Sequence, residues 1–381
     1  MPYNVGDIIL QKSLGKGNYG EVFLSQKQNM PGYFATKKME ITKFENPHFY
    51  KRLFNELNII MLVNHPNIVK YIDFKRTMNN YYLVTEYING GSLSDNLQKY
   101  MSLYGKPFSE EITQYLMKQI LDALNYLHFN NIIHRDLKLD NILVNYSSDI
   151  DKQNVNLKNC QIKLIDFGFA TMLNNKTQLA FTVLGTPNNM DPKILKAVTM
   201  GQFTGYNEKV DIWSLGTICY EMVVGCSPFR GGNMFELYQK VEKGNYLLPM
   251  TLSEEIVSFI NQMLQQDEKQ RADAKYLLNH PFIVNPVSSF HNIDVRKIKA
   301  NYIPGGLINM ESKQPETKIN YNNNQPYNVW SIFNQQKPNQ GGAYSTAQQI
   351  PTEFQNKIQP QSQAQQPGEH SHFVYQKKIY Y

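Results

Sequence analysis

Apolar and polar residues follow two different patterns along the chain, and the pattern changes near residue 90. Upstream of this point, short apolar runs separated by turn residues predict strands, at 7–15, 20–26, 33–39, 69–77 and 81–88. One helix is expected among them, at 46–63. From 92 to 283, apolar residues recur mainly at helical spacing. The chain is therefore predicted to be an α+β protein, with a small strand-rich part, a larger helical part and a cleft between the two.

Three segments of the helical part carry clear helix signals. In 109–128 the apolar residues fall at helical spacing, at Ile112, Tyr115, Leu116, Ile120, Ala123, Leu124 and Leu127. Ser109 is expected to cap this helix, with Glu110 and Glu111 in the first turn, where negative charge is favourable. The segment 253–264 opens with the same Ser-Glu-Glu start. The segment 211–225 is apolar nearly all round, which predicts a buried helix.

The composition of the chain changes again near Pro281. From Val284 to Tyr381 the chain is rich in Gln, Asn, Pro and Ser. Such a segment cannot bury enough apolar surface to offset the entropy lost on ordering. A folded unit over 1–283 is therefore predicted, followed by a disordered tail over 284–381. The final FVYQKKIYY is compatible with a short docking motif or with an unstructured end.

The net charge does not indicate a partner. The 381 residues carry a formal net charge of +6, and only 18% of them are charged. From Val284 onward there are nine Lys or Arg and five Asp or Glu, so four of the six net positive charges belong to the predicted tail. The folded unit is nearly neutral, and no nucleic-acid partner is expected.

Cysteine and targeting signals favour a cytoplasmic protein. Cys160, Cys219 and Cys226 form no CxxC pair, which excludes a disulfide scaffold and a zinc-finger array and fits a reducing compartment. The N-terminus has neither the basic nor the apolar region of a signal peptide. No run approaches the roughly 18 apolar residues that suggest a membrane span. We therefore expect an intracellular, cytoplasmic protein.

A glycine-rich motif follows the first predicted strand. It reads Gly15-Lys16-Gly17-Asn18-Tyr19-Gly20-Glu21-Val22. A dinucleotide-binding fingerprint should open a helix, whereas the residues after this motif indicate another strand. Two interpretations remain for the motif alone: a tight hairpin, or a hairpin whose backbone N–H groups approach phosphates, which glycine permits.

Two further motifs appear downstream in a fixed order. His134-Arg135-Asp136 is followed by Lys138 and Asn141, and Asp166-Phe167-Gly168 comes after an apolar strand. Together with the glycine motif and Lys37 on its strand, this order resembles the eukaryotic protein kinases of Ser/Thr type, over roughly 3–283. The resemblance implies a bilobal fold, with an N-lobe over about 1–88 and a C-lobe over about 89–283.

The resemblance also implies a use of ATP and Mg²⁺ and a role for individual residues. The implied catalytic residues are Lys37, Glu56, Asp136, Lys138 and Asn141. The implied nucleotide-binding residues are Leu14, Gly15, Lys16, Gly17, Asn18, Tyr19, Gly20, Val22, Ala35, Lys37, Thr85, Glu86, Ile88 and Asp166. The implied metal ligands are Asn141 and Asp166, which offer the oxygen atoms that Mg²⁺ prefers.

The segment from Asp166 to about Pro192 resembles the activation segment of these kinases. It contains four threonines, Thr171, Thr177, Thr182 and Thr186. Thr182 stands where many kinases carry an activating phosphate, and Arg135 is the residue that usually pairs with it. We expect an upstream kinase to act at Thr182; an unmodified loop threonine is the alternative.

Two segments depart from the family pattern. Asp191-Pro192-Lys193 stands where Ala-Pro-Glu is usual, so the buried Arg that this Glu pairs with, here Arg271, needs another partner. The candidates are Asp191, Asp267 and Glu268. The segment 145–160 is longer than usual and predicts a polar hairpin or loop insertion.

The subfamily and the activity leave alternatives open. Phrases such as IDFGFA and SLGTICYEMVVGCSPF are similar to the Unc-51-like, autophagy-initiating kinases, and the calcium/calmodulin-dependent group is second. The expected reaction is transfer of the ATP γ-phosphate to Ser or Thr hydroxyls of protein substrates. A pseudokinase scaffold is the main alternative, and an adaptor that acts through its tail is a third.

Overall fold

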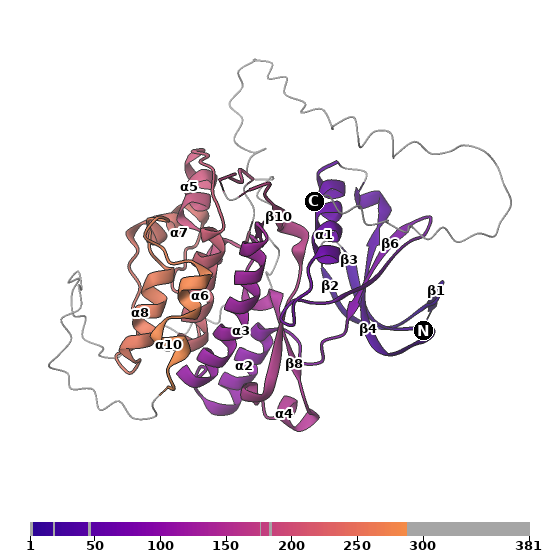
Figure 1. The fold of residues 1–381 in the computed structure, drawn as a ribbon, viewed down its shortest axis with the longest axis horizontal. Coiled ribbons are helices and arrows are strands. Elements are labelled where there is room, and N and C mark those ends of the chain that lie inside the picture. Colours follow the sequence, from indigo (N-terminus) through magenta and orange to yellow (C-terminus); the bar gives the residue numbers. More distant parts are fainter. Residues whose placement is uncertain (1–2, 18–19, 45–46, 176, 183–184, 288–381) are drawn as a thin grey trace, which may run out of the picture. The chain divides into compact units, whose positions relative to one another are not determined.

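The computed structural model describes residues 3–17, 20–44, 47–175, 177–182 and 185–287, and all structural statements below concern these residues (Figure 1). Asn18 and Tyr19 of the glycine motif lie outside them. So does the predicted tail from residue 288 onward, and its disorder stays a prediction. We call the described residues up to Ile88 the N-lobe and those from Asn89 to Val287 the C-lobe.

The N-lobe is built on an antiparallel sheet with the strand order β1-β2-β3-β4-β6-β5. Its strands are β1 (Tyr3–Val5), β2 (Ile8–Gly17), β3 (Gly20–Lys27), β4 (Met30–Glu40), β5 (Tyr71–Arg76) and β6 (Asn80–Glu86). The helix α1 (Pro47–Leu62) lies beside the sheet (Figure 1). Five of the strands and the helix were predicted. The three-residue β1 was not, because it is too short to show alternation.

The register of the sheet sorts its residues into two faces. Val22 pairs with Lys37, and Ala35 pairs with Thr85, and these four side chains share one face because residues two apart on a strand point the same way. The opposite face packs a small core of its own, made of Val5, Ile8, Leu10, Phe34, Tyr82 and Val84. This core fixes the register, since a slip by one residue would turn every apolar side chain outward.

The C-lobe is mainly helical, as predicted, and its helices cover most of the left-hand side of Figure 1. They are α2 (Leu93–Tyr104), α3 (Glu110–Phe129), α4 (Asp149–Gln153), α5 (Pro192–Met200), α6 (Lys209–Val224), α7 (Met234–Lys243), α8 (Glu254–Met263), α9 (Ala274–Leu278) and α10 (Pro281–Val284). The predicted apolar helix is α6, whose residues from Val210 to Tyr220 are all buried. Ser109 and Ser253 cap α3 and α8, each contributing about 1 kcal/mol.

Two small antiparallel sheets of two strands each carry the segments next to the sequence motifs. β7 (Ile132–Ile133) pairs with β10 (Thr171–Met172), and β8 (Ile142–Tyr146) pairs with β9 (Cys160–Leu164). The long segment between β8 and β9 is the predicted insertion and holds the short helix α4. Its Asp151 accepts hydrogen bonds from the side chains of Ser148, Asn156 and Asn159. The insertion is therefore closed by its own polar side chains.

The loop after α1 joins the two lobes. Asn67 donates through its side chain to Gln119 Oε1 of α3 at 3.0 Å and to Ile162 O of β9 at 3.1 Å. Backbone bonds from Leu164 N to Asn67 O and from Val69 N to Leu164 O continue this contact. β9 is therefore anchored to the N-lobe immediately before Asp166, which fixes where that carboxylate lies.

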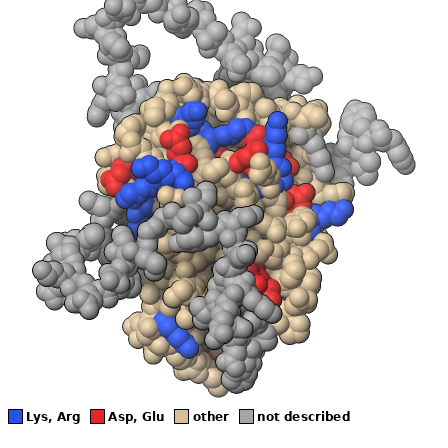
Figure 2. All heavy atoms as spheres, turned by 90° about the vertical axis from the view of Figure 1, so that its left-hand side faces the viewer, with Lys and Arg blue, Asp and Glu red and all other residues tan. Residues whose placement is uncertain are grey.

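Surface charge in the described part of the chain is mixed. On the face shown in Figure 2, Lys and Arg side chains alternate with Asp and Glu. None of the described helices combines the length and the hydrophobicity that are needed to cross a bilayer.

Candidate active site

Lys37 of β4 and Glu56 of α1 form an ion pair between the sheet and the helix. Lys37 Nζ lies 2.9 Å from Glu56 Oε1, and the two side chains are 23% and 9% exposed. Lys37 is on the sheet face that also carries Val22 and Ala35. A lysine on a sheet is thereby held over that face by a carboxylate from another element.

Asp166 lies in a strained turn at the end of β9. Its backbone has φ 62°, a left-handed value that costs a non-glycine residue free energy and is common at functional sites. Its Oδ1 accepts a hydrogen bond from Gly168 N at 3.2 Å. Burial alone would raise the pKa of Asp166, but Lys37, the Gly168 N–H, His134 and Lys138 together lower it below the ordinary value. Asp166 is therefore held as a carboxylate directed into a positive environment.

The Asp136 carboxylate is buried and receives three side-chain donors. Thr186 Oγ1 donates to Asp136 Oδ1 at 2.8 Å, and Asn141 Nδ2 donates to Asp136 Oδ2 at 2.9 Å. Lys138 Nζ lies 3.1 Å from the same Oδ2 and donates to Thr186 Oγ1 at 3.2 Å. In the sequence, Thr186 stands out only as one of four threonines of the activation segment. Its hydroxyl reaches Lys138 and Asp136 only because the chain folds back on itself. A long-range contact of this kind leaves no signal in the local sequence.

The arrangement of Asn141 and Asp166 fits a hard divalent cation. The Asn141 side-chain nitrogen is occupied by Asp136, which leaves the amide oxygen for another contact. The backbone Asn141 O accepts from Ile165 N at 3.0 Å, so the two oxygen-bearing residues come from neighbouring backbone segments. One carboxylate and one amide oxygen are typical of a Mg²⁺ site that is completed by water and phosphate oxygens.

Asp211 at the start of α6 supports the loop that carries Asp136. Its carboxylate accepts from His134 N at 2.9 Å and from Arg135 N at 2.8 Å, and His128 Nε2 lies 2.9 Å from it. Burial raises the pKa of Asp211, but these hydrogen bonds and the nearby histidines bring it below its ordinary value. Arg135 has φ 68°, so the bonds hold a strained backbone immediately before Asp136.

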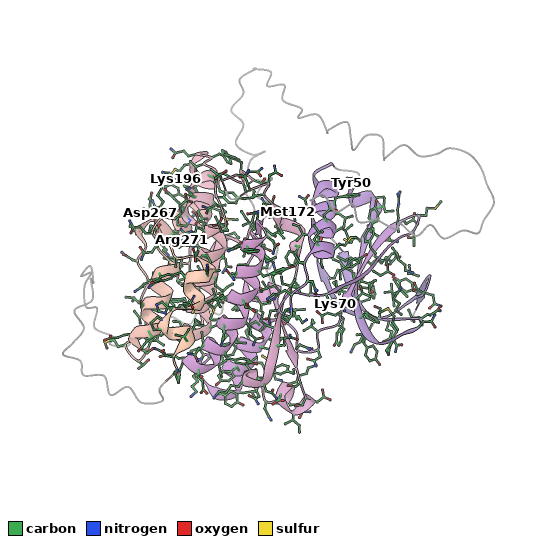
Figure 3. The ribbon with its side chains drawn as sticks, in the orientation of Figure 1. Tyr50, Lys70, Met172, Lys196, Asp267 and Arg271 are labelled. Carbon is green, nitrogen blue, oxygen red and sulfur yellow. The ribbon has the colours of Figure 1, made fainter. Side chains whose placement is uncertain are left out.

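The segment at the end of β6 contains the predicted adenine contacts. Thr85 Oγ1 donates to Ala35 O at 3.5 Å. Glu86 was predicted to act through its backbone, and no role was predicted for its side chain. That side chain lies 2.7 Å from Lys163 Nζ of β9 and accepts a hydrogen bond from Lys70 N at 2.8 Å. Lys70 is labelled in Figure 3. These contacts fix the connection between the lobes, and the adenine contacts of the Glu86 and Ile88 backbone stay a prediction.

The described part of the glycine motif leaves room beside it. A Cβ atom added at Gly15 or Gly17 would meet no atom within 4 Å, whereas one at Gly20 would lie 2.1 Å from Lys38 O. Gly20 is therefore required by close backbone packing. Gly15 and Gly17 border open space, which is what a hairpin over a phosphate chain requires, and Leu14 beside them is 41% exposed.

Arg135 does not contact the Thr182 side chain. Its guanidinium donates to Phe169 O, Ala170 O and the Tyr206 hydroxyl at 2.5, 3.3 and 3.2 Å. The Tyr206 hydroxyl in turn donates to Thr182 O at 2.6 Å. The exposed Thr182 is thus joined to Arg135 through one tyrosine.

Asp191 is the partner of the buried Arg271. Arg271 Nη1 lies 2.5 Å from Asp191 Oδ2, and both side chains are almost fully buried. Lys193 turns outward to Glu268 at 2.7 Å. Of the three candidates from the sequence, the structure selects Asp191. Arg271, labelled in Figure 3, also lies 5.1 Å from the ring centre of Trp213 in α6.

The chain is similar to known proteins over most of its length. The family model of the protein kinase domain matches residues 8–283. Myosin light chain kinase A of Dictyostelium discoideum is 32% identical over 316 residues, which cover 81% of this chain and 96% of that protein. Serine/threonine-protein kinase apg-1 of Neurospora crassa is 28% identical over 331 residues, or 77% of this chain and 33% of that protein. Calcium-dependent protein kinase 4 of Plasmodium falciparum is 32% identical over 293 residues, or 76% and 52%.

These relatives differ in length and kind. The chain spans nearly all of the Dictyostelium relative but only about a third and a half of the other two. All three are named as kinases, and their identities to this chain are similar. The similarity therefore does not separate the two subfamilies that the sequence suggests.

Proposed function

The chain belongs to the protein kinase family and is a protein serine/threonine kinase. On this premise, we propose that it transfers the γ-phosphate of ATP to Ser or Thr hydroxyls of protein substrates, with Mg²⁺ as cofactor. The observation that carries the proposal is the Asp136 carboxylate, buried and bonded to Thr186, Lys138 and Asn141. Phosphoryl transfer requires an oriented hydroxyl, and a fixed carboxylate is the group that can orient it.

The residues of the C-lobe site act on the acceptor and on the transferring phosphate. Asp136 accepts the hydrogen bond of the substrate hydroxyl and aims its oxygen. Lys138, 3.1 Å from that carboxylate, supplies positive charge where the phosphate passes. The Thr186 hydroxyl fixes the positions of both side chains by hydrogen-bonding to each of them. A lysine two residues after Asp136 is the Ser/Thr pattern of the family, which supports Ser and Thr as acceptors.

The residues around the sheet hold the nucleotide. Lys37, positioned by Glu56, would contact the α- and β-phosphates, and Val22 and Ala35 on the same face would cover the base. Asp166 and Asn141 would hold Mg²⁺. When bound, the cation neutralises charge on the phosphate oxygens.

A pseudokinase scaffold is the alternative to this proposal. What speaks slightly for it is that Asp191-Pro192-Lys193 replaces the usual Ala-Pro-Glu. Because Asp191 pairs with Arg271, the buried arginine keeps a carboxylate partner despite this replacement. The proposal of an active enzyme therefore needs no additional partner for Arg271.

An assay of the full chain with γ-labelled ATP, Mg²⁺ and a mixture of Ser, Thr and Tyr peptides tests this function. Label is expected on phosphoserine and phosphothreonine, none on phosphotyrosine, and none when EDTA removes the metal. Label on tyrosine would contradict the acceptor class. No label from the wild-type protein, even after incubation with other cellular kinases, would support the scaffold instead.

We further propose that an upstream kinase activates the enzyme at Thr182. A phosphate there adds a charge of about −1.5 to −2 near Arg135, which Tyr206 already links to the Thr182 backbone. Thr182→Ala is expected to lower the activated kcat about tenfold, which corresponds to about 1.4 kcal/mol. Thr177→Ala, at another exposed threonine of the segment, is the control. Undiminished turnover in Thr182→Ala, with phosphorylation followed by mass spectrometry, would disprove the proposal.

A cytoplasmic location is also part of the proposal. Its support is that Cys160, Cys219 and Cys226 are all free thiols. Localisation of a tagged chain in cells tests it directly.

A further inference from the structure

An exposed apolar surface lies on the activation segment. Ala180 pairs with Tyr206 through two backbone hydrogen bonds of 2.8 and 3.0 Å, which holds this part of the segment extended. Because side chains alternate along an extended chain, Ala180 points inward and Leu179 and Phe181 point outward, with 40% and 64% of their surface exposed. Phe203, three residues before Tyr206, is 50% exposed. We call Leu179, Phe181 and Phe203 the Phe181 surface.

Gly205 allows the Phe181 surface to form. A Cβ atom at Gly205 would lie 2.7 Å from Leu179 Cβ and 2.9 Å from Phe181 Cζ. Both side chains therefore lie directly against the glycine backbone. Any larger residue at this position would push them away, so the two segments of the surface fit each other only with glycine here.

The Phe181 surface is mainly apolar. The segments 177–190 and 197–207 contain no Asp, Glu, Lys or Arg, and the charged side chain beside them is Lys193 of α5, whose Nζ donates to Gly205 O at 3.3 Å. Large apolar side chains gathered at the surface mark interaction sites more often than scattered ones do. This mainly apolar composition favours an apolar partner segment over a highly charged one.

The Phe181 surface lies within reach of the site where a protein substrate is expected to bind. Thr186, whose hydroxyl contacts Asp136, follows Phe181 by five residues, so the two Cα atoms are at most about 18 Å apart. Tyr206 ties the surface to Arg135, the neighbour of Asp136. A substrate chain in extended form covers about 3.3–3.6 Å per residue, so about six residues suffice to span the distance.

We propose that the Phe181 surface is a docking subsite for the protein substrate. It would bind a large apolar side chain, such as Leu or Phe, located within about six residues of the phosphorylated Ser or Thr. The proposal rests on the proposed kinase activity and specifies part of its substrate class. The substrate gains affinity at this subsite, so the effect falls on KM and not on the chemical step.

The test uses two sets of peptides with the full chain. The first set is short, with three residues on either side of the acceptor, and reports the kinase activity alone. The second set is long and carries one Leu at each position up to six residues from the acceptor, in an otherwise polar background. We expect Leu at one of the distal positions to raise kcat/KM about tenfold through KM.

Substitutions separate docking from folding. Leu179→Ser combined with Phe181→Ser is expected to abolish the preference for the distal Leu while kcat on the short peptides stays at the wild-type value. Gly205→Ala should weaken the same preference by displacing both side chains. Phe235→Ser, at a phenylalanine on α7 that is also 50% exposed, is the matched control and should keep the preference.

Four outcomes overturn the proposal. The first is a wild-type enzyme without a distal preference, and the second is a double variant that keeps it. The third is an equal loss on short and long peptides, which would make the surface structural. The fourth is a concentration-dependent dimer of the wild type that the double variant lacks, since the surface would then join two copies. Failure of the wild type on the short peptides would instead refute the kinase activity itself, and the docking proposal with it.

Discussion

Asp166→Asn is expected to leave the protein folded and to lower kcat by roughly 10³-fold. The amide has the size of the carboxylate, and its oxygen can still accept the hydrogen bond from Gly168 N. It loses the negative charge that Lys37 and Lys138 keep in place by lowering the pKa of Asp166. A metal ion that stabilises a phosphoryl transition state contributes several kcal/mol, and about 4 kcal/mol corresponds to this factor.

Turnover measured over a range of Mg²⁺ concentrations checks this expectation. The Asp166→Asn variant should require more Mg²⁺ for its residual activity, while its urea midpoint stays close to that of the wild type. Asp140→Asn is the matched control, because Asp140 is an exposed carboxylate of the loop that carries Asp136. A wild-type kcat in Asp166→Asn at equal Mg²⁺ would show that Asp166 does not hold the metal.

The elements of the fold could be predicted where the pattern is long and regular. The strands β2 to β6 and the helices α1, α3, α6 and α8 show in the spacing of apolar residues, and Ser109 caps α3 as expected. The strand β1 has three residues, too few for a period to appear. Its place in the sheet depends on the small core that Val5, Ile8 and Leu10 form, a tertiary contact that the local sequence does not encode.

The candidate site also contains residues that could be predicted from the sequence and residues that could not. Motif residues such as Lys37, Asp136 and Asp166 stand at fixed spacings and can be named from sequence. Thr186 and Lys163 cannot, because their partners Asp136 and Glu86 are 50 and 77 residues away. Long-range contacts between two polar side chains leave no periodic signal, and many surface residues share the same identities.

Asp191→Ala is expected to lower the free energy of unfolding by about 3–5 kcal/mol. Asp191 and Arg271 are both almost fully buried, and removal of one partner leaves the other charge without compensation in a low-dielectric interior. Asp191 also caps α5 by accepting from Lys193 N at 2.7 Å, which is worth about 1 kcal/mol. Urea unfolding followed by fluorescence measures the loss. A change below about 1 kcal/mol would show that Arg271 is not destabilised by the loss of this carboxylate.

A second substitution distinguishes loss of this ion pair from general damage. Asp191→Ala with Lys193→Glu restores the Ala-Pro-Glu order of the family, and the introduced glutamate can then turn inward to Arg271. We expect the double variant to recover at least half of the lost stability. Because Thr186, which contacts Asp136, lies five residues before Asp191, any activity that Asp191→Ala loses should recover as well. Lys193→Ala alone breaks the partly exposed ion pair with Glu268 and the hydrogen bond from Lys193 Nζ to Gly205 O, and should cost less than about 1 kcal/mol. If the double variant were less stable than Asp191→Ala, the buried arginine would accept a carboxylate only from position 191, and the two charge arrangements would not be interchangeable in this chain.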